Sequence, residues 1–269
     1  MDGKKNFIIN GASDWVYEEE FTLTRAFEWS PDGEDIAYLR FDESHVKEFT
    51  LEYYKNETYP EPYTFKYPKV GEENSNLTVW NYSLKKKKSV QLDIGEREDD
   101  YLPRMKWTGT QDELCITWMN RDQNHLKLIV NNVSTNKYRT LLEEKNKYYI
   151  DLHDNLQFLT NGNFIWTSEQ SGYNQIYLYE ATGRLIKGLT EGNEELTEIY
   201  GMDEAQQNLL FQKSVNRGLD RAIYKLNLET KQITPIAINP GYNSAQAVSY
   251  THLRAHETDS YLVCRLLLE

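Results

Sequence analysis

The sequence predicts an all-β fold, a partial β-propeller of about four to five blades with four short strands each. The 20 Tyr, 6 Trp and 9 Phe are spread among Ile, Val and Thr, residue types that suit a pleated, half-buried surface. Pairs of short alternating segments, separated by turn residues, recur along the chain. No stretch of a dozen residues keeps apolar side chains at helical spacing, which argues against a doubly wound α/β sheet.

Residues 27–40 form the clearest predicted hairpin. Apolar and polar residues alternate on both sides of a Pro-Asp-Gly turn at residues 31–33. Further along, the lysine run at residues 85–88 lies between two short strand-like segments. We interpret it as the solvated tip of a second hairpin rather than a nucleic-acid site.

Weaker copies of the first hairpin follow, and each is paired with another hairpin. The copies span residues 105–119, 156–168 and 199–213, and their partners turn through residues 133–136, 181–183 and 229–230. The wider first interval requires an insertion, for which residues 53–68, rich in Tyr, Pro and Glu, are the candidate. A plain β-sandwich is the competing architecture, because irregular hairpins alone do not distinguish it from blades.

Charge and cysteine content exclude several classes of function. The net charge of −12 opposes binding to a phosphate backbone, so no nucleic-acid partner is expected. No apolar run reaches the length of a membrane span, and the first residues lack the hydrophobic core of a signal peptide. Two cysteines are too few for a disulfide framework, and Cys115 lies in an apolar run typical of a buried thiol. The histidines show no metal-ligand spacing, so neither a metal nor another cofactor is expected.

Three consecutive carboxylates, Glu18, Glu19 and Glu20, lie among aromatic residues just before the first hairpin. Carboxylates this close repel one another, and their aromatic neighbours suggest partial burial, so a cation should offset the charge. A protonated amine fits, because its three N–H groups can be accepted by two carboxylates with charge assistance. On spacing alone, an ordinary acidic solvated turn remains the simpler interpretation.

Residues 10–20, Asn-Gly-Ala-Ser-Asp-Trp-Val-Tyr-Glu-Glu-Glu, resemble the segment of dipeptidyl peptidase IV family propellers that bears a double-Glu motif. Further matches follow in the family's order at residues 29–33, 36–38 and 67–71, with Asn74 shortly after. The resemblance extends over residues 6 to 247 and is most specific up to residue 76. It implies a propeller of seven or eight blades when intact.

The resemblance also implies roles for individual residues. Glu19 and Glu20 would bind the free N-terminal amine of a peptide substrate, supported by the other members of the segment, which are Asp14, Trp15, Tyr17 and Glu18. The family's substrate-contacting arginines have no clear match here, since residues 147–151 offer no Arg.

A serine-type dipeptidyl aminopeptidase that releases Xaa-Pro or Xaa-Ala dipeptides is the activity that the resemblance implies. Its Ser, Asp and His would lie on an α/β-hydrolase domain; no Gly-x-Ser-x-Gly elbow occurs in this sequence, so the chain alone is expected to be inactive. The implied partners are peptides with a free N-terminus, that hydrolase domain and a second copy in a homodimer, and the implied location is periplasmic or outward-facing. A non-catalytic peptide- or protein-binding propeller is the alternative from another class, and a tripeptidyl or acylaminoacyl peptidase is a lesser one.

The expected domain is residues 1–247, a propeller truncated at both ends. Residues 248–269 break from the blade pattern and resemble translated sequencing-adapter read-through, so we do not interpret His252, His256 or Cys264 as a site. The physical alternative is a short C-terminal helix that ends the domain.

Overall fold

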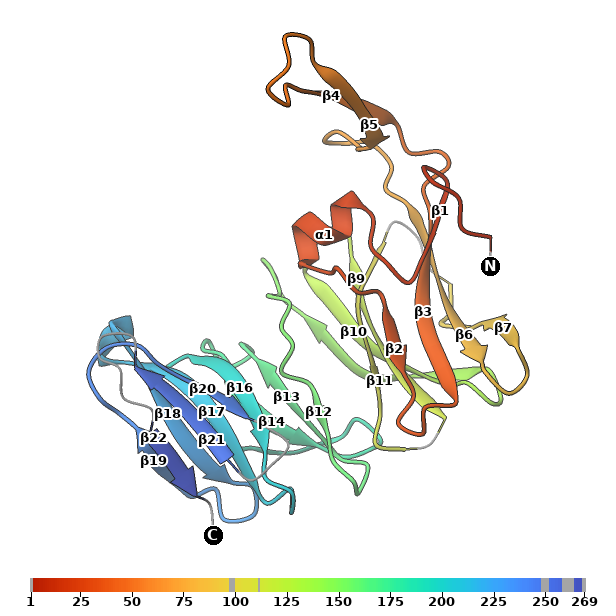
Figure 1. Ribbon diagram of the computed structural model, residues 1–269. Coiled ribbons are helices and arrows are strands. Elements are labelled where there is room, and N and C mark those ends of the chain that lie inside the picture. The colour runs from red at the N-terminus through yellow and green to blue at the C-terminus, as the bar shows by residue number, and fades with distance from the viewer. Residues whose placement is uncertain (1, 97–99, 111, 248–251, 258–263, 268–269) are drawn as a thin grey trace. The chain divides into compact units, whose positions relative to one another are not determined.

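A computed structural model describes residues 2–96, 100–110, 112–247, 252–257 and 264–267 (Figure 1). Antiparallel β-sheets account for most of the regular structure. The chain divides into two compact units, Met1–Leu152 and His153–Glu269, each with sheets of its own.

The first sheet of the first unit has an interrupted edge strand. Its strands are β1 (Ile8–Asn10), β2 (Phe27–Trp29), β3 (Asp35–Asp42), β6 (Asn76–Ser83) and β7 (Lys88–Gln91). They follow the order β1-β3-β6-β7, and β2 also pairs with β3. Because β1 and β2 both run antiparallel to β3 and pair with successive parts of it, together they act as one strand.

Two insertions leave this sheet. The short helix α1 (Trp15–Phe21) lies between β1 and β2, and a two-stranded arm of β4 (Glu48–Tyr53) and β5 (Glu61–Lys66) lies between β3 and β6 (Figure 1). The insertion predicted at residues 53–68 is therefore confirmed, although the arm begins earlier, at Glu48.

The second sheet is a regular meander. It consists of β8 (Asp100–Trp107), β9 (Glu113–Asn120), β10 (His125–Asn132) and β11 (Lys137–Lys145), in the order β11-β10-β9-β8. Its central strands carry the expected buried thiol: Cys115 is 1% exposed, and burial raises its pKa to about 12.

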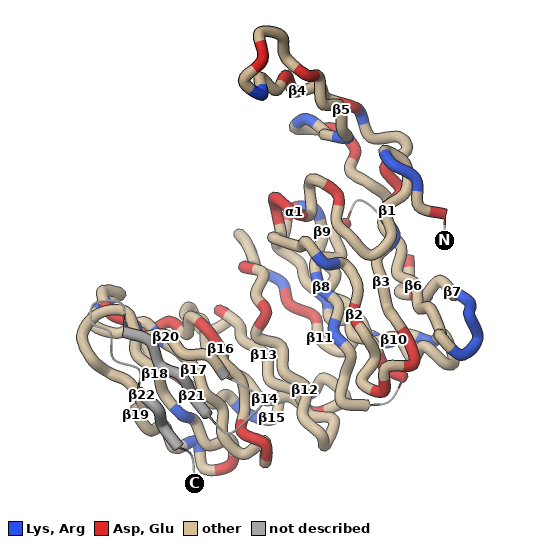
Figure 2. The backbone as a smooth tube through the Cα atoms, in the orientation of Figure 1, with Lys and Arg blue, Asp and Glu red and all other residues tan. Residues whose placement is uncertain are grey.

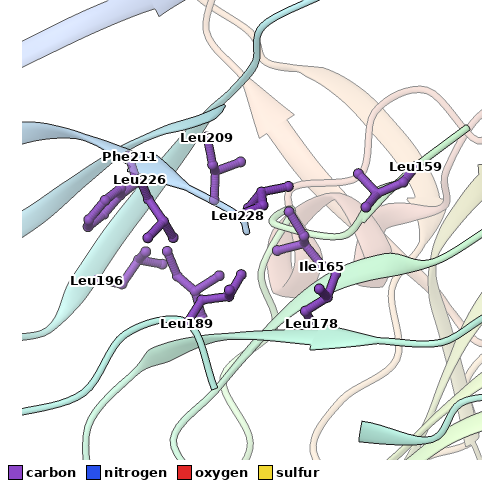
Figure 3. Close-up of a cluster of buried hydrophobic side chains, with 10 residues drawn as sticks. Leu159, Ile165, Leu178, Leu189, Leu196, Leu209, Phe211, Leu226 and Leu228 are labelled. Carbon is purple, nitrogen blue, oxygen red and sulfur yellow. The ribbon is translucent and has the colours of Figure 1, made fainter. Parts of the chain in front are cut away.

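The second unit contains two more four-stranded meanders. One is formed by β12 (Gln157–Phe158), β13 (Phe164–Ser168), β14 (Gln175–Tyr179) and β15 (Leu185–Gly188). The other is formed by β16 (Leu196–Met202), β17 (Asn208–Val215), β18 (Asp220–Asn227) and β19 (Ile233–Ala237), with the short 3-10 helix η1 (Asn216–Gly218) between β17 and β18. A shared apolar cluster joins the two sheets (Figure 3), with members that include Leu159, Ile165, Ile176, Leu189, Leu209, Phe211 and Leu226.

A three-stranded sheet follows, formed by β20 (Asn243–Ala247), β21 (His252–Glu257) and β22 (Cys264–Leu267). The described residues after 247 are therefore strands rather than the short helix considered as an alternative. Residues 248–251, 258–263 and 268–269 lie outside the described residues. The proposal that residues 248–269 are non-native stays a prediction, as does the domain limit at residue 247.

The predicted all-β fold is confirmed. Each hairpin predicted from turn residues is present, and the hairpins combine into four-stranded antiparallel blades as expected. The lysine run also lies as predicted, at the tip between β6 and β7.

Candidate functional site

The loop that carries the acidic triplet is closed at its base by backbone hydrogen bonds. Gly11 N donates to Leu39 O at 3.0 Å, Leu39 N to Ala26 O at 2.9 Å, and Ala26 N to Gly11 O at 3.1 Å. Gly11 has a φ of +75°, a conformation that residues with a Cβ rarely adopt. The chain can therefore leave the edge of the sheet after Gly11, form α1 and return at Ala26. We call Gly11, Ala26 and Leu39 the neck.

Asp14 begins the helix. Its Oδ1 accepts a hydrogen bond from Tyr17 N at 2.9 Å, the usual contact of an N-cap, and its Oδ2 accepts one from Ser75 Oγ at 2.6 Å. The side chain is only 6% exposed, and burial raises the pKa of its carboxyl against the opposing effect of these hydrogen bonds. Glu43, also buried, lies close enough for the charge of Asp14 to add to the burial that raises the pKa of Glu43.

One face of α1 is anchored in an aromatic cluster. Tyr17 and Phe21, four residues apart, are 1% and 3% exposed. The ring of Tyr17 lies 5.1 Å from that of Phe41 on β3, and the ring of Phe21 lies 5.0 Å from that of Tyr101 on β8. The hydroxyl of Tyr17 also accepts a hydrogen bond from Leu102 N at 2.9 Å. The helix is thereby fixed to both sheets of the first unit.

The two ends of α1 have further contacts. At the C-terminal end, Thr22 adopts the left-handed conformation with φ 54°, and Arg104 Nη1 donates to Phe21 O at 2.9 Å. A cation at this position also matches the negative end of the helix dipole. At the N-terminal end, the ring of Trp15 lies 4.0 Å from that of Tyr67, at the base of the arm.

The acidic triplet occupies the remaining faces of this anchored helix. Successive helical residues are about 100° apart, so Glu18, Glu19 and Glu20 fan around the side away from Tyr17 and Phe21. All three are exposed, and Figure 2 shows the acidic colour along α1. Within the described part of the chain, no Lys, Arg or His forms an ion pair with any of them. The cation that the sequence led us to expect is therefore not supplied by these residues.

Two residues that the sequence analysis did not predict as site residues, Gln123 and Tyr149, are linked by hydrogen bonds to the acidic triplet. Gln123, in the turn between β9 and β10, donates from Nε2 to Glu20 Oε1. Its Oε1 accepts a hydrogen bond from Tyr149 Oη at 2.8 Å. These residues are far from α1 in sequence, and no local pattern indicates their contact.

Nearly the whole chain matches a known protein family. A model of the dipeptidyl peptidase IV (DPP IV) N-terminal region matches residues 1–263. The chain belongs to this family. It is 34% identical in sequence to dipeptidyl peptidase 4 of Porphyromonas gingivalis, whose crystal structure covers 95% of this chain with a TM-score of 0.88. A putative dipeptidyl aminopeptidase IV from Bacteroides ovatus is 26% identical, covers 94% of the chain and gives a TM-score of 0.82.

The chain is also similar to fungal dipeptidyl peptidases 4. Dipeptidyl peptidase 4 of Trichophyton rubrum is 29% identical over 258 residues, which are 91% of this chain and 33% of that protein. A probable dipeptidyl peptidase 4 of Aspergillus fumigatus is 28% identical over 260 residues, which are 85% of this chain and 32% of that protein. The chain thus spans about a third of the length of these dipeptidyl peptidases, and it corresponds to their propeller region.

Among the described residues, no helix has the length and apolar character needed to cross a membrane. Nor do they contain a group of three or more His, Cys, Asp or Glu side chains placed to hold a metal ion.

Proposed function

We propose that this chain is the substrate-binding part of a serine-type dipeptidyl aminopeptidase, in which Glu19 and Glu20 bind the free N-terminal amine of a peptide. The observation that carries the proposal is the pair of exposed carboxylates, which form no ion pair with any described residue and are held on a helix that is anchored at both ends. Membership of the DPP IV N-terminal family supports it.

Amine binding at this helix would set the distance between the N-terminus of the substrate and the bond that is cleaved. An ammonium has three N–H donors, and two neighbouring carboxylates can accept them in charge-assisted hydrogen bonds. Because α1 is fixed to two sheets, the ammonium would be held at a constant distance from a nucleophile on a hydrolase domain. That distance would place the second peptide bond for cleavage and would exclude peptides whose N-terminus is blocked.

The rest of the proposal concerns the whole protein. We infer Pro or Ala at the second substrate position, a Ser-Asp-His triad on an α/β-hydrolase domain, assembly as a homodimer and a periplasmic or outward-facing location. Asp14, Trp15, Tyr17 and Glu18 would support the segment that presents the two carboxylates.

The experiment measures kcat/KM for release of Gly-Pro and Ala-Pro from chromogenic substrates by the complete gene product that contains this chain. Glu19→Gln and Glu20→Gln should each reduce it by the equivalent of about 2–5 kcal/mol, the range for truncated charge pairs that are hydrogen-bonded and buried in a complex, as the substrate ammonium and these carboxylates would be. Glu191→Gln, which removes an exposed carboxylate in the second unit, is the matched control and should match the wild type.

Either of two results would contradict the proposal. Unchanged activity in both variants would mean that the triplet is an ordinary solvated segment. No activity in the folded wild type would instead favour the non-catalytic peptide-binding propeller. The 269-residue chain assayed by itself should release no dipeptide, because it contains no Gly-x-Ser-x-Gly nucleophile.

A further inference from the structure

Gln123 occupies an unusual backbone position. Its φ is 52°, in the left-handed region where Gly or Asn is favoured, and the residue is only 8% exposed. The side chain of Asn120 closes the turn by accepting from Asn124 N at 3.1 Å and from His125 N at 2.9 Å. Gln123 O accepts a further hydrogen bond from Ile150 N at 2.8 Å. The turn is therefore held from both sides, with the Gln123 side chain directed to Glu20.

The chemistry of the neighbours fixes the orientation of the Gln123 amide. The carboxylate of Glu20 only accepts hydrogen bonds, so the NH₂ group faces Glu20, and the amide oxygen faces the hydroxyl of Tyr149. Partial burial, and then the charges of Glu20 and Asp151, raise the pKa of Tyr149, so this hydroxyl stays a donor at neutral pH. Donation therefore runs in one direction, from Tyr149 to Gln123 and from Gln123 to Glu20.

A neutral amide differs in effect from a cation at this position. A Lys or Arg beside Glu20 would form an ion pair with it and compete with an incoming ammonium. An amide orients the carboxylate without neutralising it. Among the described residues, the hydrogen bond from Gln123 to Oε1 is the only hydrogen bond or ion pair that the Glu20 side chain forms.

We propose that Gln123, supported by Tyr149, is the positioning residue of the amine site. It holds the Glu20 carboxylate in one orientation and leaves the negative charge available for the substrate ammonium. The inference rests on the proposed function, because it gives Glu20 its role, and it extends that role to two residues outside the acidic segment.

The test compares two ligands that differ only in the amine, Ala-Pro and propionyl-proline, as competitive inhibitors of the complete gene product. The inhibition constant of propionyl-proline divided by that of Ala-Pro measures what the amine contributes to binding, and we call this quotient the ratio. Gln123→Gly removes the side chain but retains the turn, because Gly adopts a φ of 52° without strain. We expect it to lower the ratio by roughly tenfold, as for loss of a hydrogen bond to a charged group, and Tyr149→Phe to lower it by about threefold. Binding of propionyl-proline should not change in either variant.

Two variants are matched controls. Lys87→Gly places Gly at another left-handed position, with φ 50° at the β6–β7 tip, and Tyr148→Phe removes the hydroxyl of the neighbouring tyrosine, which is 76% exposed. Both should keep the wild-type ratio. If Gln123→Gly reduces the folded fraction, Tyr149→Phe still decides the question, because that side chain is 46% exposed and loses only its hydroxyl.

The outcomes separate this inference from the proposed function. If Glu20→Gln lowers the ratio while Gln123→Gly and Tyr149→Phe do not, the positioning role is wrong and the amine site remains. Equal weakening of both ligands by Gln123→Gly would show a merely structural role and would also overturn the inference. If Glu20→Gln and Glu19→Gln both leave the ratio unchanged, the proposed amine site fails, and the positioning role fails with it; if only Glu20→Gln leaves it unchanged, the positioning role alone is wrong.

Discussion

The two insertions in the first sheet differ in how they are held. Helix α1 returns two aromatic side chains to the sheets, Tyr17 at 1% and Phe21 at 3% exposure. By contrast, every residue of β4 in the arm is exposed. An inserted segment becomes a rigid support for a site only when it brings apolar side chains back into the core, because burial of those side chains is what offsets the entropy of ordering it.

The arm is instead stabilised by its own cross-strand contacts. Tyr53 and Tyr63 pair with ring centroids 5.8 Å apart, and the hydroxyl groups of Thr50 and Thr64 lie 2.8 Å apart. Figure 1 shows the arm extending from the first sheet without a second layer. Two-stranded hairpins of this kind are marginally stable in isolation.

The largest effect should come from removing the anchor of the helix. Tyr17→Ala should lower the free energy of unfolding of the first unit by about 3–5 kcal/mol, through a cavity in the aromatic cluster. It also leaves Leu102 N without the acceptor that the hydroxyl provides. Urea unfolding followed by tryptophan fluorescence measures the change. A loss below about 1 kcal/mol would show that α1 is held no better than the arm.

A smaller effect is expected at the start of the helix. Asp14→Ala removes the N-cap acceptor and the partner of Ser75 Oγ, and should cost about 1–2 kcal/mol in the same measurement. Asp14→Asn retains an acceptor for Tyr17 N and should cost less. Equal losses in the two variants would mean that the cap contact does not stabilise α1.

The pH dependence of stability should also distinguish Asp14. Burial raises its pKa above 3.8 in the folded protein, so its stabilising contribution is full below that pH and is lost as pH rises through the raised value. The stability difference between wild type and Asp14→Asn should therefore shift against the wild type as the pH rises above about 4. Glu43 acts in the same direction, since burial and the charge of Asp14 raise its pKa too. Urea unfolding across this range would contradict the assignment if the difference stayed constant.

The smallest effect belongs to the arm. Tyr63→Ala, at a side chain that is 47% exposed, should change the free energy of unfolding by no more than about 0.5 kcal/mol. Chymotrypsin should cut first after Tyr54 at the exposed arm tip, before it cuts at the buried Tyr17 or Phe21 of α1, as mass spectrometry of the first fragments would show. A loss from Tyr63→Ala as large as that from Tyr17→Ala would remove the contrast between the two insertions.

Local sequence signals predicted most of the fold. The Pro-Asp-Gly turn at residues 31–33 is specified by neighbouring residues, and its hairpin forms where expected. Helix α1 was not predicted, because seven residues are too few to show periodicity. The available signals were an N-capping Asp14 and two aromatic residues, Tyr17 and Phe21, at a spacing of four.

The candidate site was predictable only in part. Family resemblance located the acidic triplet, because consecutive residues form a motif. Gln123 could not be predicted in this way, because it lies 103 positions from Glu20 in the sequence and the residues of its turn form no recognisable motif. The interruption of the edge strand was likewise invisible, because β1 and β2 have three residues each and only their common pairing with β3 identifies them as one strand.

The neck at Gly11, Ala26 and Leu39 separates the strand pairing of the blade from the segment that the neck closes. Because its hydrogen bonds keep the pairing along β3 continuous, the blade does not depend on the length of the segment between Gly11 and Ala26. We therefore expect the blade to tolerate a segment of different length between Gly11 and Ala26, provided that the new segment also places apolar side chains where Tyr17 and Phe21 are buried.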